Sequence, residues 1–483
     1  MTDRIQRLGL ILGVAFCLLL AALTRIQVVD ASKLSNDPRN TRALTAAFSA
    51  DRGLIQTSDG TLLARSIESG DEFKRQREYP EGALFAPVTG YLSFTFGADG
   101  AERAFNDDLV GGALPKGDDS LRNLFAKKNR VGDVTLTINA AVQRVAAQAL
   151  GERRGAVVAL DPTTGAVLAL VNFPSFDPAP LSAHSQDAVR AAWKELQADP
   201  LKPLLPRSFR EAYAPGSTFK VVTASAALDH KPELGTKQYP SLTELDLPRT
   251  ENNLHNFGGS RCGGTIADLL RVSCNTGMAL VGLDVGGDDM TAEARAFGFD
   301  ERPPFDLPAA AASHFPDASE FNRNEPGIAF SAIGQQNVKA TPMQMALVAA
   351  AIANGGIIMK PHVLDHVSDA RGVEVRRYEP SAWRTATSGA TAAVIKQMMI
   401  DVARRGTATR AQVPGITVAA KTGTAQTGRN TSHAWLIAFA PAEAPRIAVA
   451  VIVEGQDGLG DTVTGGRIAA PIAQQVMKAA LGA

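Results

Sequence analysis

The stretch Ala214-Pro215-Gly216-Ser217-Thr218-Phe219-Lys220 joins a sharp loop to a predicted helix and places a serine three residues before a lysine. The helix is predicted over residues 217–229, which are rich in Ala and Val. Positions i and i+3 share one helix face, so the Ser217 hydroxyl and the Lys220 amine can come within hydrogen-bonding distance. A lysine whose pKa is lowered by burial or by a second cation can activate such a serine. The alternative is a helix-capping serine followed by a solvated lysine.

Two further short motifs follow along the chain. Ser273-Cys274-Asn275 lies between two helical patterns and offers a second hydroxyl as a proton relay, together with a side-chain amide. Read alone, it is also typical of a polar turn between helices. Lys421-Thr422-Gly423 follows a predicted strand. There Lys421 adds positive charge, Gly423 lets a substrate backbone approach, and the strand edge can pair with an extended peptide.

Residues 415–422 nearly match the phosphate-binding pattern G-x-x-x-x-G-K-T, with Ala420 in place of the second glycine. Such a loop must open a helix whose N-terminus faces the phosphates. A glycine-containing segment and then a strand pattern follow here instead. The sequence therefore predicts no nucleotide site.

The composition excludes several classes of protein. The chain has 483 residues, with 49 basic and 49 acidic side chains and a formal net charge of zero, whereas nucleic-acid binding needs a basic excess. Its 45% hydrophobic and 20% charged residues fit a globular protein of about three domains. The Cys and His residues show no metal-ligand spacing, so we predict no metal and no cofactor. Cys262 and Cys274 form either a disulfide or two free thiols, and the sequence leaves both open.

The N-terminus carries one apolar segment. Leu8 to Thr24 spans 17 residues without a charge, the lower limit for crossing a bilayer core. Arg4 and Arg7 precede it, which by the positive-inside rule keeps the N-terminus in the cytoplasm and sends everything after Arg25 across the membrane. A cleaved signal peptide is the alternative, but no clear small-x-small cleavage site is present, which favours a retained single-pass anchor in the cell membrane.

Hydrophobic patterns divide the chain into a cytoplasmic tail with anchor (1–29), a polar, Gly-rich and irregular pedestal domain (30–148) and a larger domain (149–483). A turn over Thr57–Gly60 predicts a hairpin in the pedestal. Helices in the middle of the large domain and strands at both of its ends predict an α+β fold, an antiparallel sheet covered by helices. The helices are predicted at 134–150, 217–229, 265–271, 276–283, 342–354 and 468–481, and the strands at 155–160, 166–171, 416–420, 434–440 and 447–453.

The three motifs occur in the order known from penicillin-binding proteins and serine β-lactamases. The chain resembles the class B penicillin-binding proteins, which are monofunctional peptidoglycan D,D-transpeptidases, and among them those like penicillin-binding protein A. The resemblance covers most of the chain from about residue 39. Similar patterns are Arg52-Gly53-Leu54-Ile55, the segment 155–162, Ile333-Gly334-Gln335, Thr341-Pro342, Asn354-Gly355-Gly356 and Ser432-His433-Ala434-Trp435.

The resemblance implies a role for each motif residue. Ser217 would attack the penultimate D-Ala of a peptidoglycan stem peptide to form an acyl-enzyme, with Lys220 as base. Ser273 and Asn275 would relay the leaving-group proton and hold the substrate amide, while Lys421 keeps Lys220 deprotonated and attracts the terminal carboxylate. Thr422, Gly423 and Thr424 would bind that end of the substrate, with Thr422 and Thr424 on the carboxylate. The backbone N–H groups of Ser217 and Thr424 would form the oxyanion hole, and β-lactams would acylate Ser217.

Other readings differ in testable ways. A class A β-lactamase needs a Glu-x-x-Leu-Asn segment between the second and third motifs, but the partial match Glu251–Leu254 lies before Ser273. A D,D-carboxypeptidase shares all three motifs. A β-lactam sensor would need a cytoplasmic signalling region, and only about seven residues precede the anchor. No glycosyltransferase domain fits before residue 150, so the resemblance implies that a separate membrane glycosyltransferase and other cell-wall proteins act as partners.

Overall fold

The computed structural model describes residues 2–25, 48–111, 131–251, 253–427, 431–455 and 464–483. Contacts divide the chain into two compact units, residues 1–51 with 66–76 and residues 52–65 with 77–483. The first unit contains α1 (Thr2–Thr24), whose segment Gln6–Thr24 is long and apolar enough to cross a membrane. This helix covers the predicted anchor.

A five-stranded antiparallel sheet forms the centre of the second unit, in the order β17-β18-β19-β7-β8. Its two halves come from opposite ends of the large domain, as the sequence predicts. The hairpin between β7 and β8 is closed by the turn Asp161–Gly165, where the Asp161 N–H donates to the Ala166 carbonyl at 2.8 Å. The strands are β7 (Gly155–Leu160), β8 (Val167–Phe173), β17 (Ala419–Gln426), β18 (Ser432–Ala440) and β19 (Ile447–Val453).

The prediction for the strand before the third motif is wrong in its bounds. Residues 416–420 were expected to form it, but β17 begins at Ala419 and runs through the Lys-Thr-Gly motif to Gln426. Ile416 instead makes an isolated bridge with Val413. Residues 421–426 are mostly polar and carry no strand signal of their own. They form a strand because they pair with the apolar β18 beside them.

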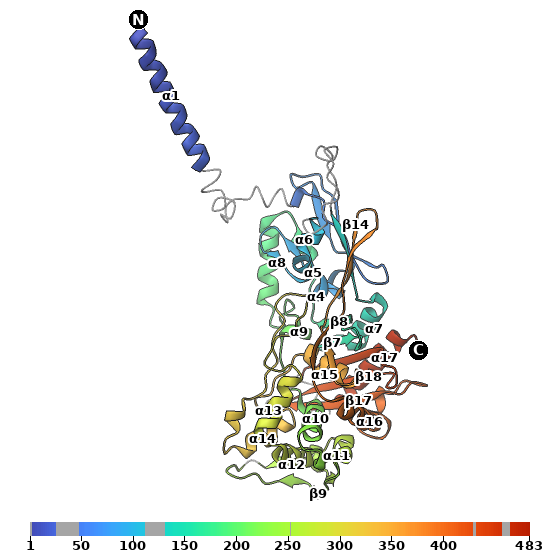
Figure 1. Cartoon of the computed structure of the whole chain (residues 1–483). Coiled ribbons are helices and arrows are strands. Elements are labelled where there is room, and N and C mark those ends of the chain that lie inside the picture. The colour runs from blue at the N-terminus through green and yellow to red at the C-terminus, as the bar shows by residue number, and fades with distance from the viewer. Residues whose placement is uncertain (1, 26–47, 112–130, 252, 428–430, 456–463) are drawn as a thin grey trace. The chain divides into compact units, whose positions relative to one another are not determined.

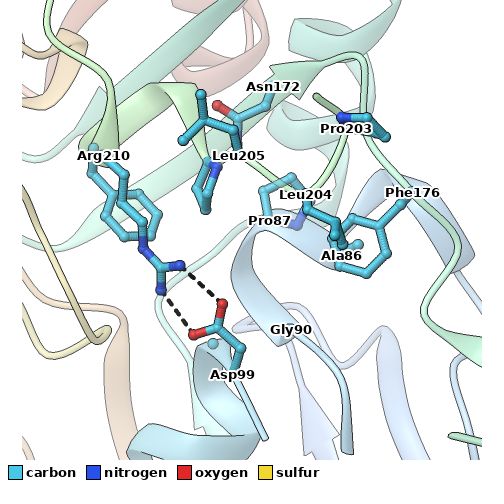
Figure 2. A pocket seen from close by; sticks show the side chains of 13 residues that line it. Ala86, Pro87, Gly90, Asp99, Asn172, Phe176, Pro203, Leu204, Leu205 and Arg210 are labelled. Carbon is cyan, nitrogen blue, oxygen red and sulfur yellow. Dashed lines mark hydrogen bonds and ion pairs between the residues drawn. The ribbon is translucent and has the colours of Figure 1, made fainter. Parts of the chain in front are cut away.

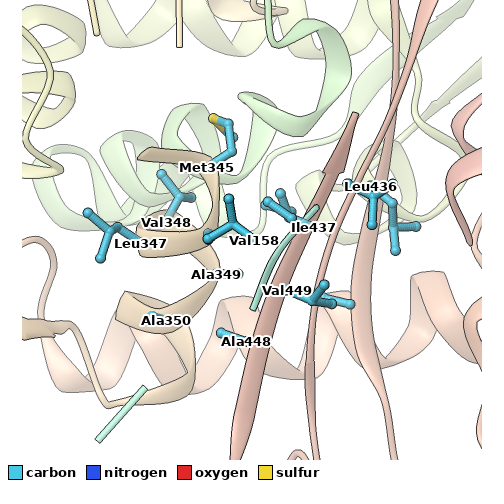
Figure 3. Close-up of a cluster of buried hydrophobic side chains, with 14 of the residues drawn as sticks. Val158, Met345, Leu347, Val348, Ala349, Ala350, Leu436, Ile437, Ala448 and Val449 are labelled. Atoms are coloured by element: carbon cyan, nitrogen blue, oxygen red, sulfur yellow. The ribbon is translucent and has the colours of Figure 1, made fainter. Parts of the chain in front are cut away.

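Helices pack on this sheet. α15 (Pro342–Ala353) contacts β7, β18 and β19, and all of its residues are buried, as expected for a helix that is apolar on every side. Figure 3 shows Val348 of α15 next to Val158 of β7 and Ile437 of β18. The side chain of Thr341 caps this helix by accepting from the Gln344 N–H at 3.0 Å. Helices α7 (Ala140–Leu150) and α17 (Ala470–Leu481) lie side by side and contact β8 and β19 (Figure 1).

A helical region between β8 and α15 carries the first two motifs. α10 (Lys220–His230) follows the short helix η5 (Gly216–Thr218), and it contacts α12, α13 and α16. The remaining helices of this region and beyond are α8 (Gln186–Ala198), α9 (Arg207–Arg210), α11 (Ile266–Val272), α12 (Asn275–Val285), α13 (Gly287–Ala296), α14 (Glu325–Ala332) and α16 (Gly389–Arg405). The helices predicted at 217–229, 265–271, 276–283 and 342–354 are therefore confirmed.

The pedestal is more regular than its composition predicts. A six-stranded sheet runs in the order β15-β14-β6-β1-β2-β3, and the turn at Thr57–Gly60 joins β1 to β2 as predicted. Short helices α4 (Ala86–Thr89), α5 (Gly100–Ala104) and α6 (Asn106–Leu109) accompany it. The strands are β1 (Ile55–Gln56), β2 (Leu62–Glu68), β3 (Arg75–Glu78), β6 (Gly132–Leu136), β14 (Leu364–Asp369) and β15 (Glu374–Arg377).

Two features of this sheet differ from the sequence predictions. Residues 134–150 were expected to form one helix, but 132–136 form β6 and the helix starts at Ala140, where Asn139 caps it. Val134 and Leu136 are fully buried, and β6 is an inner strand that pairs with β1 on one side and β14 on the other. Strands β14 and β15 come from the region assigned to the larger domain, so the sheet joins residues from both predicted domains.

Candidate active site

The nucleophile candidate lies in a tightly braced turn. Gly216 has a φ of +53°, and its N–H donates to the Gly334 carbonyl at 2.9 Å. The Thr218 hydroxyl donates to the Pro215 carbonyl at 2.7 Å. These contacts bury the residues on both sides of Ser217, whereas Ser217 itself stays partly exposed. The turn therefore presents one hydroxyl at the start of α10.

Lys220 lies wholly inside the protein and reaches the second motif. Its Nζ donates to the Ser273 backbone carbonyl at 2.8 Å and to Asn275 Oδ1 at 2.7 Å. Ser273 ends α11 in the left-handed conformation, with φ 62° and ψ 39°, an unusual backbone for a residue other than glycine. The loop between α11 and α12 therefore turns both a carbonyl and an amide oxygen toward one buried amine.

Lys421 reaches the same loop from the sheet. Its Nζ donates to Ser273 Oγ at 2.9 Å and to the Thr422 carbonyl at 2.9 Å. Its side chain is fully buried on β17, as that of Lys220 is on α10. The structure thus brings the three sequence motifs together, because both lysines end on Ser273 or Asn275.

The burial of two lysines side by side shifts their protonation. Burial, together with the positive charge of Lys421, holds the pKa of Lys220 well below its usual value. Burial lowers the pKa of Lys421 to about 7. A neutral amine is a base, and both burial and the charge of Lys421 disfavour the protonated state of Lys220.

One expected contact is replaced by others. Within the described residues, no hydrogen bond joins the Ser217 hydroxyl to the Lys220 amine, since that amine donates to the Ser273–Asn275 loop instead. Hydrogen bonds between catalytic groups are often long in the absence of substrate. The two residues are still held on one turn at the start of α10.

The third motif lies on the edge strand β17, next to the nucleophile turn. A Cβ added to Gly423 would lie 2.9 Å from the Pro215 carbonyl, so the strand and the turn meet there. Thr424 is partly exposed, while the buried Thr422 shares a hydroxyl hydrogen bond of 2.5 Å with Thr407. Thr407 was not predicted from the sequence, because no motif surrounds it. It lies just after the end of α16, which places it beside Thr422.

Cys262 and Cys274 form a disulfide with a Cα–Cα distance of 5.9 Å. This settles the two alternatives that the sequence left open. Cys274 is the middle residue of the second motif, so the bond ties that loop to β12 (Cys262–Gly264), which pairs with β9 (Tyr239–Leu242). The second motif is therefore held by a covalent link as well as by the two lysines.

Gly334→Ala is expected to destabilise the nucleophile turn. Gly334 has a φ of +70°, and an added Cβ would lie 2.2 Å from the Gly216 carbonyl. The backbone strain alone costs about 1–3 kcal/mol, and the clash adds to it. Gly372→Ala is the matched control, because Gly372 has a φ of +79° and open space around it. Thermal denaturation should show a larger fall in Tm for G334A than for G372A, and equal falls would contradict the bracing role.

Lys421→Gln is expected to move the acid limb of the acylation rate to higher pH. The Lys421 ammonium disfavours a second positive charge, so its loss raises the pKa of Lys220, and the free amine then exists only at higher pH. The measurement is the rate constant for a fluorescent penicillin between about pH 5 and pH 10. Lys478→Gln, on the last turn of α17, is the control. An acid limb that stays in place or moves down would contradict the coupling of the two lysines.

A small pocket is formed by residues that precede the nucleophile turn in the sequence. It is lined by Phe176, Leu204, Leu205 and neighbouring residues, and Arg210 on its wall forms a two-pronged ion pair with Asp99 at 2.8 and 2.9 Å (Figure 2). None of the motif residues lines it. This pocket is separate from the site where the motifs meet.

Comparisons with known proteins show the family to which the chain belongs. The Penicillin binding protein transpeptidase domain matches residues 155–478, and the Penicillin binding protein A dimerisation domain matches residues 52–134. Peptidoglycan D,D-transpeptidase PbpA of Mycolicibacterium smegmatis is 40% identical over 499 residues, covering 100% of this chain and 99% of that protein. PbpA of Mycobacterium tuberculosis is 37% identical over the same lengths.

Solved structures of a relative show acylated states. The ceftriaxone acyl-enzyme complex of penicillin-binding protein A from M. tuberculosis superposes with a TM-score of 0.83 at 35% identity, covering 90% of this chain and 100% of that one. The penicillin G acyl-enzyme complex of the same protein gives a TM-score of 0.81 at 36% identity, covering 89% and 100%. The chain therefore belongs to the class B penicillin-binding proteins, among those that are similar to penicillin-binding protein A.

Proposed function

We propose that Ser217 is the nucleophile of a peptidoglycan D,D-transpeptidase and that Lys220 is its base. The enzyme class follows from the family, and the residue roles rest on the geometry of the described site. The observation that carries these roles is the contact of two buried lysines with Ser273 and Asn275, close to the turn that holds Ser217. Two lysines in this state disfavour each other's charge, which leaves an amine free to accept a proton.

The reaction runs in two halves. Ser217 Oγ attacks the carbonyl carbon of the penultimate D-Ala of a stem peptide, and its proton passes to Lys220. Backbone N–H groups of Ser217 and Thr424 stabilise the oxyanion. The bond to the terminal D-Ala breaks, and Ser273 relays a proton to the leaving amine. The amine of a second stem peptide then attacks the acyl carbon, Lys220 takes a proton from that amine, and a proton returns to Ser217 Oγ as the ester bond breaks, which leaves the two peptides cross-linked.

The remaining residues hold the substrate. Asn275 contacts the substrate amide, and Lys421 attracts the terminal carboxylate, which the hydroxyls of Thr422 and Thr424 bind. Gly423 leaves room for the substrate backbone beside β17, where an extended peptide adds to the sheet edge. β-Lactams acylate the same Ser217 because they resemble the D-Ala-D-Ala end of the substrate. Support for this part comes from the acyl-enzyme complexes of the mycobacterial relative.

The domain division and topology belong to the same proposal. Residues 1–29 form the tail and single-pass anchor, 30–148 the pedestal and 149–483 the transpeptidase domain, with the last two outside the cytoplasm. The apolar Gln6–Thr24 segment supports the anchor, and the Cys262–Cys274 disulfide supports an oxidising compartment. A separate membrane glycosyltransferase supplies the glycan strands whose stem peptides this enzyme joins, alongside other cell-wall proteins.

The test is a competition between two acceptors. The full-length chain in detergent is incubated with a D-Ala-D-Ala thioester analogue and a D-amino acid, and aminolysis is compared with hydrolysis. Transfer to the D-amino acid is the expected main product. Hydrolysis as the main outcome would identify a D,D-carboxypeptidase. Stable penicillin binding without any turnover would identify a sensor.

A further inference from the structure

The loop before the second motif ends in a buried asparagine. The short strands β10 (Glu244–Leu245) and β11 (Leu254–His255) form a hairpin, and Asn256 follows it directly. Only 5% of Asn256 is exposed, whereas the neighbouring Phe257 is 61% exposed. A polar side chain that is buried next to an exposed residue such as Phe257 must find its hydrogen-bond partners within the protein.

Asn256 binds the start of α12 with the oxygen of its amide, while the nitrogen binds two carbonyls before α11 and also donates to the Thr276 hydroxyl at 3.2 Å. Its Oδ1 accepts from the backbone N–H groups of Asn275 at 2.9 Å and Thr276 at 3.0 Å. Its Nδ2 donates to the carbonyls of Leu242 at 2.9 Å and Ser260 at 3.0 Å. A flipped amide would face donors with a donor and acceptors with an acceptor, so this orientation is the only one that satisfies all four.

These contacts replace a missing helix cap. α12 begins at Asn275, and its N-cap residue Cys274 makes no capping hydrogen bond through its side chain. The first N–H groups of a helix need acceptors from elsewhere. Asn256 supplies one oxygen to two of them from a loop that precedes α11, so the place where α12 starts depends on this side chain.

The residue before Asn256 fixes the other end of Asn275. The His255 carbonyl accepts from Asn275 Nδ2 at 2.9 Å. With its Nδ2 held there, the Asn275 amide must turn Oδ1 the other way, toward Lys220 Nζ at 2.7 Å. His255 therefore holds the side chain of Asn275, and Asn256 holds its backbone N–H.

We infer that Asn256 is a positioning residue for acylation, acting through Asn275 on Lys220. This inference rests on the proposed function. Without the Asn256 amide, two N–H groups in the first turn of α12 lose their shared acceptor, and Asn275 Oδ1 is no longer held against the buried amine. Since misplacement of a catalytic group by about 1 Å can cost about a hundredfold in rate, the acylation step should slow while the enzyme remains able to react.

The experiment measures acylation of the full-length chain by a fluorescent penicillin, both as a rate constant and as the final labelled fraction. Asn256→Ala is expected to lower the rate constant about 10- to 100-fold while most molecules still become labelled. A purely structural role would instead lower the labelled fraction and leave its rate constant unchanged. Asn253→Ala, at a partly exposed asparagine of the same loop, is the matched control and should label at the parental rate.

A double-mutant cycle tests the route through Asn275. In an Asn275→Ala background, Asn256→Ala should cause little further loss, because the group it positions is already gone. A parental rate constant for N256A, or a full additional loss in the N275A background, would overturn the inference. If N256A does not fold, the same cycle with Asn256→Leu decides by the same criteria, because leucine has a similar volume and lacks the oxygen that accepts from the Asn275 and Thr276 N–H groups. Failure of the proposed function would show differently, as a parent protein that is not labelled.

Discussion

Ser217→Ala abolishes covalent attachment of a fluorescent penicillin to the full-length chain. The reason is that Ser217 supplies the oxygen that forms the acyl bond, whereas the other hydroxyl of this turn, that of Thr218, is buried and donates to the Pro215 carbonyl. The variant should fold normally, because Ser217 is partly exposed and alanine removes only its hydroxyl. The measurement is in-gel fluorescence after denaturation, together with the Tm of the unlabelled protein.

Ser225→Ala is the matched control for this loss. Ser225 lies on α10 and is buried, and its hydroxyl donates to the Val221 carbonyl at 3.0 Å, away from the motif residues. It should label at the parental rate. Fluorescence retained by S217A after denaturation would mean that another residue carries the acyl group, and the assignment of the nucleophile would be wrong.

Lys220→Met should reduce the acylation rate constant by about 10²–10⁴, the usual contribution of a general base. Methionine fills the buried volume of the lysine stem but accepts no proton from Ser217. It also leaves the Ser273 carbonyl and Asn275 Oδ1 without their donor, so part of the loss comes from a looser loop. Stopped-flow or timed-gel labelling gives the rate constant, and mass spectrometry shows that any remaining label is still on Ser217.

Lys231→Met controls for the loss of a lysine elsewhere, at the C-terminal end of the same helix. Lys231 follows α10, and its Nζ donates to the Asp284 carbonyl at 2.6 Å. The rate constant of this variant should stay near that of the parent. A Lys220→Met variant that acylates at the parental rate would show that some other group takes the proton.

The parts of the fold that the sequence predicts are those with local signals. The β7–β8 hairpin has two apolar runs joined by a turn, and α15 is an apolar segment bounded by Thr341-Pro342 and Asn354-Gly355-Gly356. β6 was misread as part of a helix although residues 134–138 alternate between apolar side chains and threonines, which is the period of a strand; the helical pattern that begins at Ala140 was extended over it. β14 pairs with β6, more than two hundred residues earlier in the chain, and no local sequence pattern indicates such a partner.

The candidate site divides in the same way. Motif spacing and family resemblance predict Ser217, Lys220, Ser273, Asn275 and Lys421, and the structure brings these residues together. Asn256 was not predicted from the sequence, where the preceding residues Glu251–Leu254 match only part of a β-lactamase pattern. Its importance lies in hydrogen bonds to the start of α12, which depend on how two distant loops meet. A residue that acts through backbone groups leaves no chemical pattern in the sequence.

The six-stranded sheet restricts how this protein can be cut or recombined. β14 comes from the region predicted as the larger domain and pairs with β6 in the region predicted as the pedestal, while β15 pairs with the other edge of β14. A gene fragment starting at residue 149 would therefore encode β14 without its neighbour and expose an unpaired strand edge, the kind of surface that drives aggregation. Evolutionary exchange of either part for a foreign one would have to carry two separate coding segments, so pedestal and catalytic region are expected to be inherited together.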